Sequence, residues 1–280
     1  MIARHTLREC GRRRVFIVVP VATVGFLALY ALGAHYAFRS TEGEIGTPVG
    51  LVDARALTGA TLVGLSMFVS LFLGSALGIF LSFSAVRGDA EQGLLQPLVV
   101  RPVARTGLLL GRFLGASILC AVYVVFLYAA SVVITGAIGG WWPSPVALPG
   151  LSLAAGVVVV IALTLLGSVF LSALPNGIAM FMVYGAGLMA GLLGQLGDVL
   201  SSPTLETTGE VASWVLPFEA LYQAGLYSLT SSATGLTRVI VQLGPLGGAQ
   251  AAGWPLAVWA IAYVAAVGGG ALFAFSRRDL

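Results

Sequence analysis

The side chains with the greatest capacity for specific chemistry gather in one short segment, residues 87–106. This segment holds Asp89, Glu91, Arg101 and Arg105, in a chain in which only 9% of residues are charged. Mixed charge beside apolar residues offers a surface to a protein partner. The alternative is that these charges only solvate a loop. We therefore treat the segment as the candidate binding site of this chain.

The pattern within this segment predicts a short amphipathic helix. Asp89 is a good N-cap residue, and Gln92 lies at the third helical position, as in a capping box. Pro102 ends the helix. Four apolar residues at helical spacing form its ridge: Leu94, Leu95, Leu98 and Val99.

Several kinds of catalytic site are excluded by composition. The 14 basic residues are all arginine, so the chain has no lysine for a P-loop or a Schiff base. Its two cysteines, Cys10 and Cys120, make no disulfide framework or metal cluster, and His5 and His35 are too far apart for a bis-His site. We expect no enzyme activity, no catalytic residue, no metal and no cofactor bound by this chain itself.

The chain is 58% hydrophobic, with a mean hydropathy of +0.99, whereas soluble domains carry roughly 25% charged residues. These values predict an all-α membrane protein. A spanning helix needs about 20 apolar residues, and the sequence contains six such runs in a single transmembrane domain, 1–280. The predicted spans are 15–38, 56–85, 111–138, 146–174, 177–197 and 254–275.

Residues 198–253 are too polar to cross a bilayer. We expect them to form a long external segment between the fifth and sixth spans. Glu219–Leu229 is predicted to form a short amphipathic helix that lies on the membrane surface.

The arginines predict the orientation. With both termini in the cytoplasm, 11 of the 14 arginines lie inside, which agrees with the positive-inside rule. We expect a multi-pass protein of the cell inner or plasma membrane with no nucleic-acid partner. Arg4, Arg8 and Arg12 share a helical face within residues 1–14, which predicts an interfacial helix on the anionic leaflet. A frayed basic tail is the alternative.

The predicted spans carry no Asp, Glu or Arg away from their ends, which argues against an ion-coupled secondary transporter. Small residues are abundant instead. Gly107, Gly111 and Gly115 share one helix face, which suits helix packing within the chain or a dimer seam. Seven hydroxyl residues are candidates for a substrate path: Ser66, Ser70, Ser75, Ser82, Thr164, Ser168 and Ser172.

The segment between the second and third spans resembles the membrane subunits of type-2 ABC exporters, a class that includes drug-export and nitrous-oxide-reductase maturation permeases. The family pattern combines an acidic residue, a glycine, leucines, a proline and an arginine with a G-[KR]-x-x-G ending. The matching residues are Glu91, Gly93, Leu95, Val99, Arg101, Pro102, Arg105, Leu108, Leu109, Leu110, Gly111, Arg112 and Gly115. Pro97 and Ala104 depart from the pattern, and the proline is expected to kink the helix.

The resemblance implies a permease of an ATP-driven exporter that moves substrate outward by alternating access. Residues 87–106 would contain the coupling helix, which docks on a separate ATP-binding subunit. That subunit, in two copies, would hold ATP and Mg. A second permease chain, as a homodimer or heterodimer, and the lipid bilayer complete the expected partners. Glu91 and Arg105 would be contact or hinge residues of the docking site, and Gly93 would allow close approach of the partner.

A different class of function also fits the composition. A membrane anchor or assembly subunit of an enzyme complex would need the same apolar spans and would transport nothing. Co-purification of a nucleotide-binding partner separates the two hypotheses. The sequence does not select a substrate.

Overall fold

A computed structural model describes residues 15–43, 54–86, 105–230 and 253–277. Every regular element in these ranges is an α-helix, and six of the helices are long and apolar enough to cross a membrane. This confirms the predicted fold class and the number of spans. The predicted interfacial helix, 1–14, and most of the predicted coupling segment, 87–104, lie outside the described residues.

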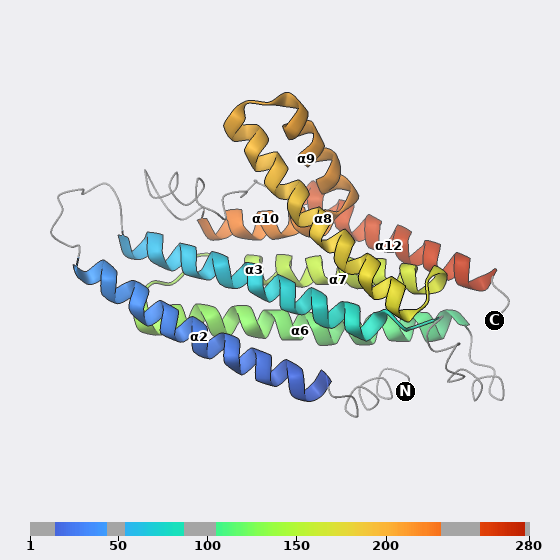
Figure 1. The fold of residues 1–280 in the computed structure, drawn as a ribbon, viewed down its shortest axis with the longest axis horizontal. Coiled ribbons are helices and arrows are strands. Elements are labelled where there is room, and N and C mark those ends of the chain that lie inside the picture. The colour runs from blue at the N-terminus through green and yellow to red at the C-terminus, as the bar shows by residue number, and fades with distance from the viewer. Residues whose placement is uncertain (1–14, 44–53, 87–104, 231–252, 278–280) are drawn as a thin grey trace.

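The six long helices form an elongated bundle (Figure 1). Residues 86 and 105, the start of the first helix and the end of the last all lie at the same end, which we call the loop end. The opposite end is called the far end. The long helices are α2 (Val15–Gly43), α3 (Ala54–Ser82), α6 (Arg105–Gly139), α7 (Ala147–Phe170), α8 (Ala173–Leu200) and α12 (Trp254–Ser276).

The central helix of the bundle is α7. It has the highest mean hydropathy of the candidate spans, 2.6, and 61% of its most apolar window is buried. A helix that is apolar on all sides is stable when other helices surround it. In this structure α3, α6, α10 and α12 pack on α7, and Leu153, Val157 and Ile161 are fully buried.

Glycines allow α3 to approach α6 and α7 closely. A Cβ atom at Gly74 would overlap Val124 of α6, and one at Gly78 would overlap Ile161 of α7. These two glycines lie four residues apart on one face of α3. Small residues at such spacing let helix backbones pack closely in a membrane, and here they do so within the chain.

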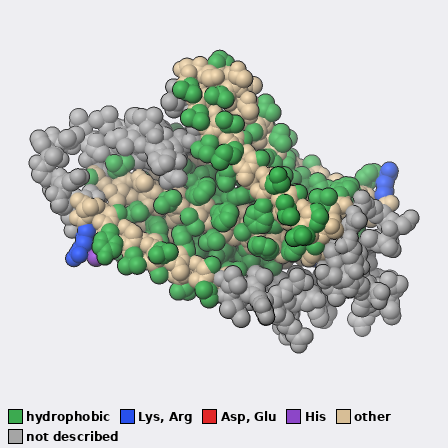
Figure 2. Space-filling model, in the orientation of Figure 1, with side chains coloured by type: hydrophobic (Ala, Val, Ile, Leu, Met, Phe, Trp, Pro, Cys, Tyr) green, Lys and Arg blue, Asp and Glu red, His purple; other side chains and the backbone are tan. Residues whose placement is uncertain are grey.

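The outer helices expose apolar side chains. Only 22% of the most apolar window of α2, 17% of that of α8 and 11% of that of α12 is buried. On the face shown in Figure 2, apolar side chains cover the middle of the bundle, and the arginines in view lie at its ends. Such a surface is stable in contact with lipid.

Beyond the fifth long helix, the chain forms two further helices, α9 (Pro203–Val215) and α10 (Pro217–Thr230). In Figure 1, α8 diverges from the bundle, and α9 returns antiparallel beside it. A Cβ atom at Gly209 would lie 2.5 Å from the Cα atom of Gly194. The two backbones therefore nearly touch where α8 and α9 cross.

The structure corrects the predicted placement of the Glu219–Leu229 helix. This helix exists as α10, but it packs on α7 and α3 instead of lying on a membrane surface. Phe218, Leu226 and Leu229 are at most 2% exposed. Glycines permit the contact, because Gly225 lies against Met67 of α3, and Gly156 of α7 lies against the backbone of Phe218.

The third long helix begins before the predicted span. It runs for 35 residues from Arg105, which corresponds to about 50 Å at 1.5 Å per residue. Because the hydrocarbon core of a bilayer is about 30 Å thick, α6 is long enough to extend beyond it. Arg112 lies two turns inside the start of α6.

Candidate functional site

The structure describes the two ends of the predicted docking segment. The predicted contact residues Asp89, Glu91, Gly93, Leu94, Leu95 and Arg101 lie outside the described residues, as do Arg4, Arg8 and Arg12. Their roles stay predictions. On one side of the segment, α3 ends in a turn at residues 83–86. On the other side, Arg105 begins α6.

An arginine of α6 binds the end of α3. The guanidinium Nη1 of Arg112 donates a hydrogen bond to the carbonyl oxygen of Ala85. Ala85 and Val86 are both buried. The last carbonyls of a helix lack partners within the helix, and a cation near them is favourable. Arg112 therefore joins the two helices that enter and leave the 87–104 segment.

A buried asparagine makes a second connection to the same turn. Asn176 lies in the first turn of α8 and is 0% exposed. Its Nδ2 atom donates to the carbonyl oxygen of Phe83, at 3.0 Å, and to that of Thr164 in α7, also at 3.0 Å. The amide thus joins three helices: α3, α7 and α8. Its Oδ1 atom rests on Gly167, where a Cβ atom would overlap it.

Aromatic packing reinforces this connection. The ring of Phe80 in α3 lies 5.8 Å from that of Phe181 in α8 and 6.2 Å from that of Phe83. Gly177 of α8 lies against the Phe83 ring. A Cβ atom at Gly177 would lie 3.6 Å from the Cδ2 atom of Phe83. The first turns of α8 are therefore packed on the last turns of α3. We call Phe83, Ala85, Arg112 and Asn176 the loop-end cluster.

A second buried polar group belongs to α10 and contacts α8 farther along that helix. Glu219 is 5% exposed, and its Oε1 atom accepts a hydrogen bond of 2.6 Å from Nε2 of Gln223. The carboxylate rests on Gly191 of α8, where a Cβ atom would overlap it. Desolvation by burial raises the pKa of Glu219 to about 7, and the bond from Gln223 opposes this shift.

Aromatic side chains of α10 and its neighbours pack close to this carboxylate. Phe218 stacks on Tyr184 of α8 with ring centroids 5.3 Å apart and an interplanar angle of 16°. Gly187 lies beneath the Phe218 ring. Tyr222 packs edge-on against Phe68 of α3, and burial, together with the nearby Glu219 charge, raises its pKa. We call Glu219, Gln223, Tyr222, Phe218 and Tyr184 the far cluster.

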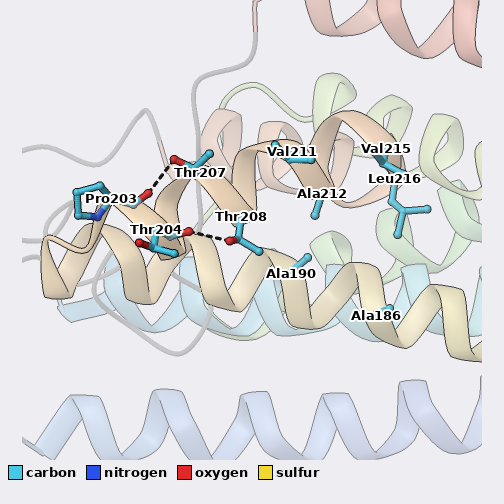
Figure 3. Close-up of a pocket in the computed structure, with 10 residues that line it drawn as sticks. All are labelled: Ala186, Ala190, Pro203, Thr204, Thr207, Thr208, Val211, Ala212, Val215 and Leu216. Carbon is cyan, nitrogen blue, oxygen red and sulfur yellow. Dashed lines mark hydrogen bonds between the residues drawn. The ribbon is translucent and has the colours of Figure 1, made fainter.

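The described surface includes two apolar cavities. The larger, of about 740 Å³, is an open groove between α8 and α9 (Figure 3). Thr207 and Thr208 point into this region, but their hydroxyls donate to carbonyl oxygens of their own helix at 2.8 and 2.7 Å. The smaller, of about 290 Å³, lies between α6, α7 and α12. Among the described side chains, none that lines either cavity is charged.

The hydroxyl residues proposed for a substrate path are placed differently. Ser66, Ser70 and Ser75 of α3 and Thr164 and Ser168 of α7 are at most 1% exposed. Ser66 and Thr164 donate to carbonyl oxygens of their own helices. None of these five residues lines either cavity described above. In this conformation they belong to helix contacts.

The predicted glycine seam lies at the start of α6. Gly107, Gly111 and Gly115 are partly buried. A Cβ atom at Gly107 would have no neighbour within 4 Å among the described residues, so packing against the described helices does not require a glycine there. Its role in a dimer seam stays a prediction.

Sequence reasoning missed Asn176 and Glu219. Asn176 lies between the predicted spans 146–174 and 177–197, where the pattern predicts only a break, and Glu219 is the first residue of the predicted surface helix. A polar side chain between two apolar runs was the available signal for Asn176. Among the described residues, no three His, Cys, Asp or Glu side chains form a group that could hold a metal.

The helices and their apolar surface define a multi-pass α-helical membrane protein. Residues 1–280 match the family described as ABC-2 family transporter protein, and the chain belongs to that family. It is therefore the membrane component of an ABC transporter, the part that is not itself the ATPase. No curated protein matches the sequence. The family membership confirms the resemblance found in residues 91–115.

Proposed function

We propose that this chain is the permease subunit of an ATP-driven exporter, which moves substrate out of the cytoplasm by alternating access. The loop-end cluster carries the proposal. It ties the turn at residues 83–86, which leads from α3 into the segment predicted to contact the ATPase, to α6, α7 and α8 through buried and partly buried polar contacts. A force on that segment therefore acts on four membrane helices at once.

The proposed assembly contains two ATP-binding subunits and a second permease chain. ATP and Mg belong to the partner subunits, because this chain has no lysine for a P-loop. The arginine distribution supports placing the loop end and both termini in the cytoplasm. In that orientation α9 and α10 lie toward the outside.

The proposed transport path is apolar. The six candidate spans have mean hydropathies of 1.5 to 2.6. A path between such helices suits lipid-like or amphiphilic cargo better than small ions, since ions need charged or polar ligands at membrane depth. ATP hydrolysis rather than an ion gradient would then supply the energy.

A charge reversal in the predicted coupling helix tests the proposal. We expect Glu91→Arg to abolish stimulation of ATPase activity by the permease in the reconstituted complex, because an acid that faces the partner would become repulsive. Glu42→Arg, on the predicted external side, is the matched control and should leave the stimulation intact. Unchanged stimulation in Glu91→Arg, with normal membrane insertion, would contradict the proposed docking site.

The alternative function is a membrane anchor or assembly subunit that transports nothing. Purification of the tagged chain from its native membrane distinguishes the two. Recovery of a stoichiometric ATP-binding subunit supports the permease. Recovery of an enzyme complex that lacks such a subunit supports the anchor.

A further inference from the structure

Asn176 is placed where the proposed input from the ATPase meets the helix that extends farthest from the bundle. It is fully buried, and its side-chain nitrogen donates to backbone carbonyls of α7 and of the turn that follows α3. Because the acceptors are backbone atoms, the hydrogen bonds depend on the position of each helix rather than on the conformation of another side chain. The geometry of this single amide thus depends on the positions of α3 and α7 relative to α8.

We propose that Asn176 is a positioning residue that transmits displacement of the end of α3 to α8, and through α8 to α10. This inference rests on the proposed function, since the displacement would originate at the docking segment. Asn176 contacts neither ATP nor substrate in this scheme. Its role is to keep the start of α8 in register with Phe83 while the docking segment moves.

The strength of the contact follows from its surroundings. A primary amide has two N–H donors, and here one nitrogen reaches two carbonyl oxygens at 3.0 Å. In an apolar interior, no water is present to bond a donor or an acceptor that has lost its partner. Separation of α3 from α8 is therefore unfavourable, and the two helix ends should move together.

The far half of α8 supplies the route to α10. Tyr184 lies two turns beyond Asn176, with its ring 6.2 Å from Phe72 of α3 and stacked on Phe218 of α10. Gly187 and Gly191 then lie against Phe218 and Glu219. Since α8 is one continuous helix from Ala173 to Leu200, a shift at its start is carried to these contacts.

A variant of Arg112 distinguishes the contact of the α3 end with α8 from its contact with α6. Arg112 binds the same turn of α3 but belongs to α6. Loss of Arg112 should weaken the attachment of the α3 end to α6 and leave the contact of the α3 end with α8 intact. Thr164→Val is a closer control, because it removes a buried hydroxyl beside Asn176 and keeps the Thr164 carbonyl that accepts the amide bond.

The experiment uses the full permease reconstituted with its ATP-binding subunit in lipid nanodiscs. Spin labels are placed at Leu192 of α8 and at Ile261 of α12, a helix outside the loop-end cluster. These side chains are 42% and 72% exposed, and the two native cysteines are replaced first. Pulsed electron–electron resonance then measures the distance distribution between them with and without ATP and vanadate. ATPase activity is recorded for the same samples.

In the wild type and in Thr164→Val, we expect trapping with ATP and vanadate to shift the distance distribution. In Asn176→Leu, ATP hydrolysis should continue, and the shifted fraction should fall about tenfold, as expected when two buried hydrogen bonds no longer bias the equilibrium. Asn176→Ser, which is smaller and has one donor, gives the same test if the leucine variant fails to fold, and its shifted fraction should also fall.

Two results would overturn the inference. If the shift persists at wild-type size in the folded Asn176 variants, Asn176 does not position α8, although the proposed function stands. If the wild type itself shows no shift on trapping, the proposed coupling fails and the inference fails with it.

Discussion

Helix α8 meets the rest of the bundle at two buried polar groups of different chemistry. Near its start, the neutral amide of Asn176 donates to two backbone carbonyls. Farther along, the carboxyl group of Glu219 rests on Gly191 and accepts a bond from Gln223. The amide has the same charge at every pH, whereas the carboxyl gains a charge near neutrality because burial raises its pKa to about 7.

One helix can therefore be held firmly at one end and conditionally at the other. A buried neutral donor with its partners present adds to stability at all pH values. A buried carboxylate is stable mainly when protonated. The contact of α8 with α3 should therefore be permanent, and its contact with α10 should weaken when Glu219 ionises.

The largest effect expected from this comparison is the pH dependence due to Glu219. The pKa rises from its ordinary value of 4.5 to about 7 on folding, so the folded protein binds more protons than the unfolded chain between these values. Stability then falls as pH rises from about 4.5 to about 7, by about 3 kcal/mol in total. Glu219→Gln is always neutral and should be more stable than the wild type by about that amount at pH 8, with little difference at pH 4.5.

Thermal unfolding in detergent between pH 4.5 and pH 8 measures this effect. Glu210→Gln is the matched control, since Glu210 is an exposed acid on the neighbouring helix α9. Parallel pH profiles for the wild type and Glu219→Gln would show that the Glu219 contact is not conditional. The contrast between the two ends of α8 would then disappear.

A second, smaller effect tests whether the far half of α8 also depends on close packing with α9. A Cβ atom at Gly209 would meet backbone atoms of Gly194 at 2.5 and 2.9 Å, whereas a Cβ atom at Gly194 would meet Gly209 at an ordinary 3.5 Å. We expect Gly209→Ala to destabilise the protein by about 2 kcal/mol, because two backbones must separate. Gly194→Ala should change little.

The unfolding temperature and the protease sensitivity of the α8–α9 connection are measured for both alanine variants. Equal behaviour of the two alanine variants would mean that α8 and α9 are not held at this crossing. In that case Glu219 and Phe218 alone would fix the far half of α8.

The smallest effect is expected at Gly107, on α6 rather than α8. A Cβ atom there meets none of the described residues within 4 Å, and alanine favours a helix over glycine by up to about 1 kcal/mol. Gly107→Ala should leave the fold of one chain intact or slightly more stable. If Gly107 belongs to a dimer seam, cross-linking of two chains in the membrane should decrease. An unchanged cross-linking yield would remove Gly107 from the seam.

The spans could be predicted from sequence because their signal is local. Each is an apolar run bounded by arginine, proline or a polar stretch, and the bilayer requires the whole run to be helical. The start of α6 at Arg105 was not predicted, because hydropathy locates the part of a helix that lies in lipid. It does not locate turns that extend beyond the membrane.

The burial of α10 could not be predicted because its cause is not local. The Glu219–Leu229 sequence has the polarity of a surface helix, and its burial depends on Gly156 and on the contact of Gly225 with Met67. Asn176 was missed for a related reason. Proline followed by asparagine is typical of a turn, and the carbonyls of Phe83 and Thr164 approach it only after three helices have packed.

The packing of α10 on α3 and α7 also sets an order of events during synthesis. Met67 and Leu71 of α3 are fully buried, and α10 covers part of this surface through Gly225 and Phe218. The ribosome completes α10 only after α3, α6, α7 and α8 have been made. Until then, the nascent bundle has an incomplete face on α3 and α7, which is the kind of surface that insertion chaperones bind and that quality-control proteases inspect.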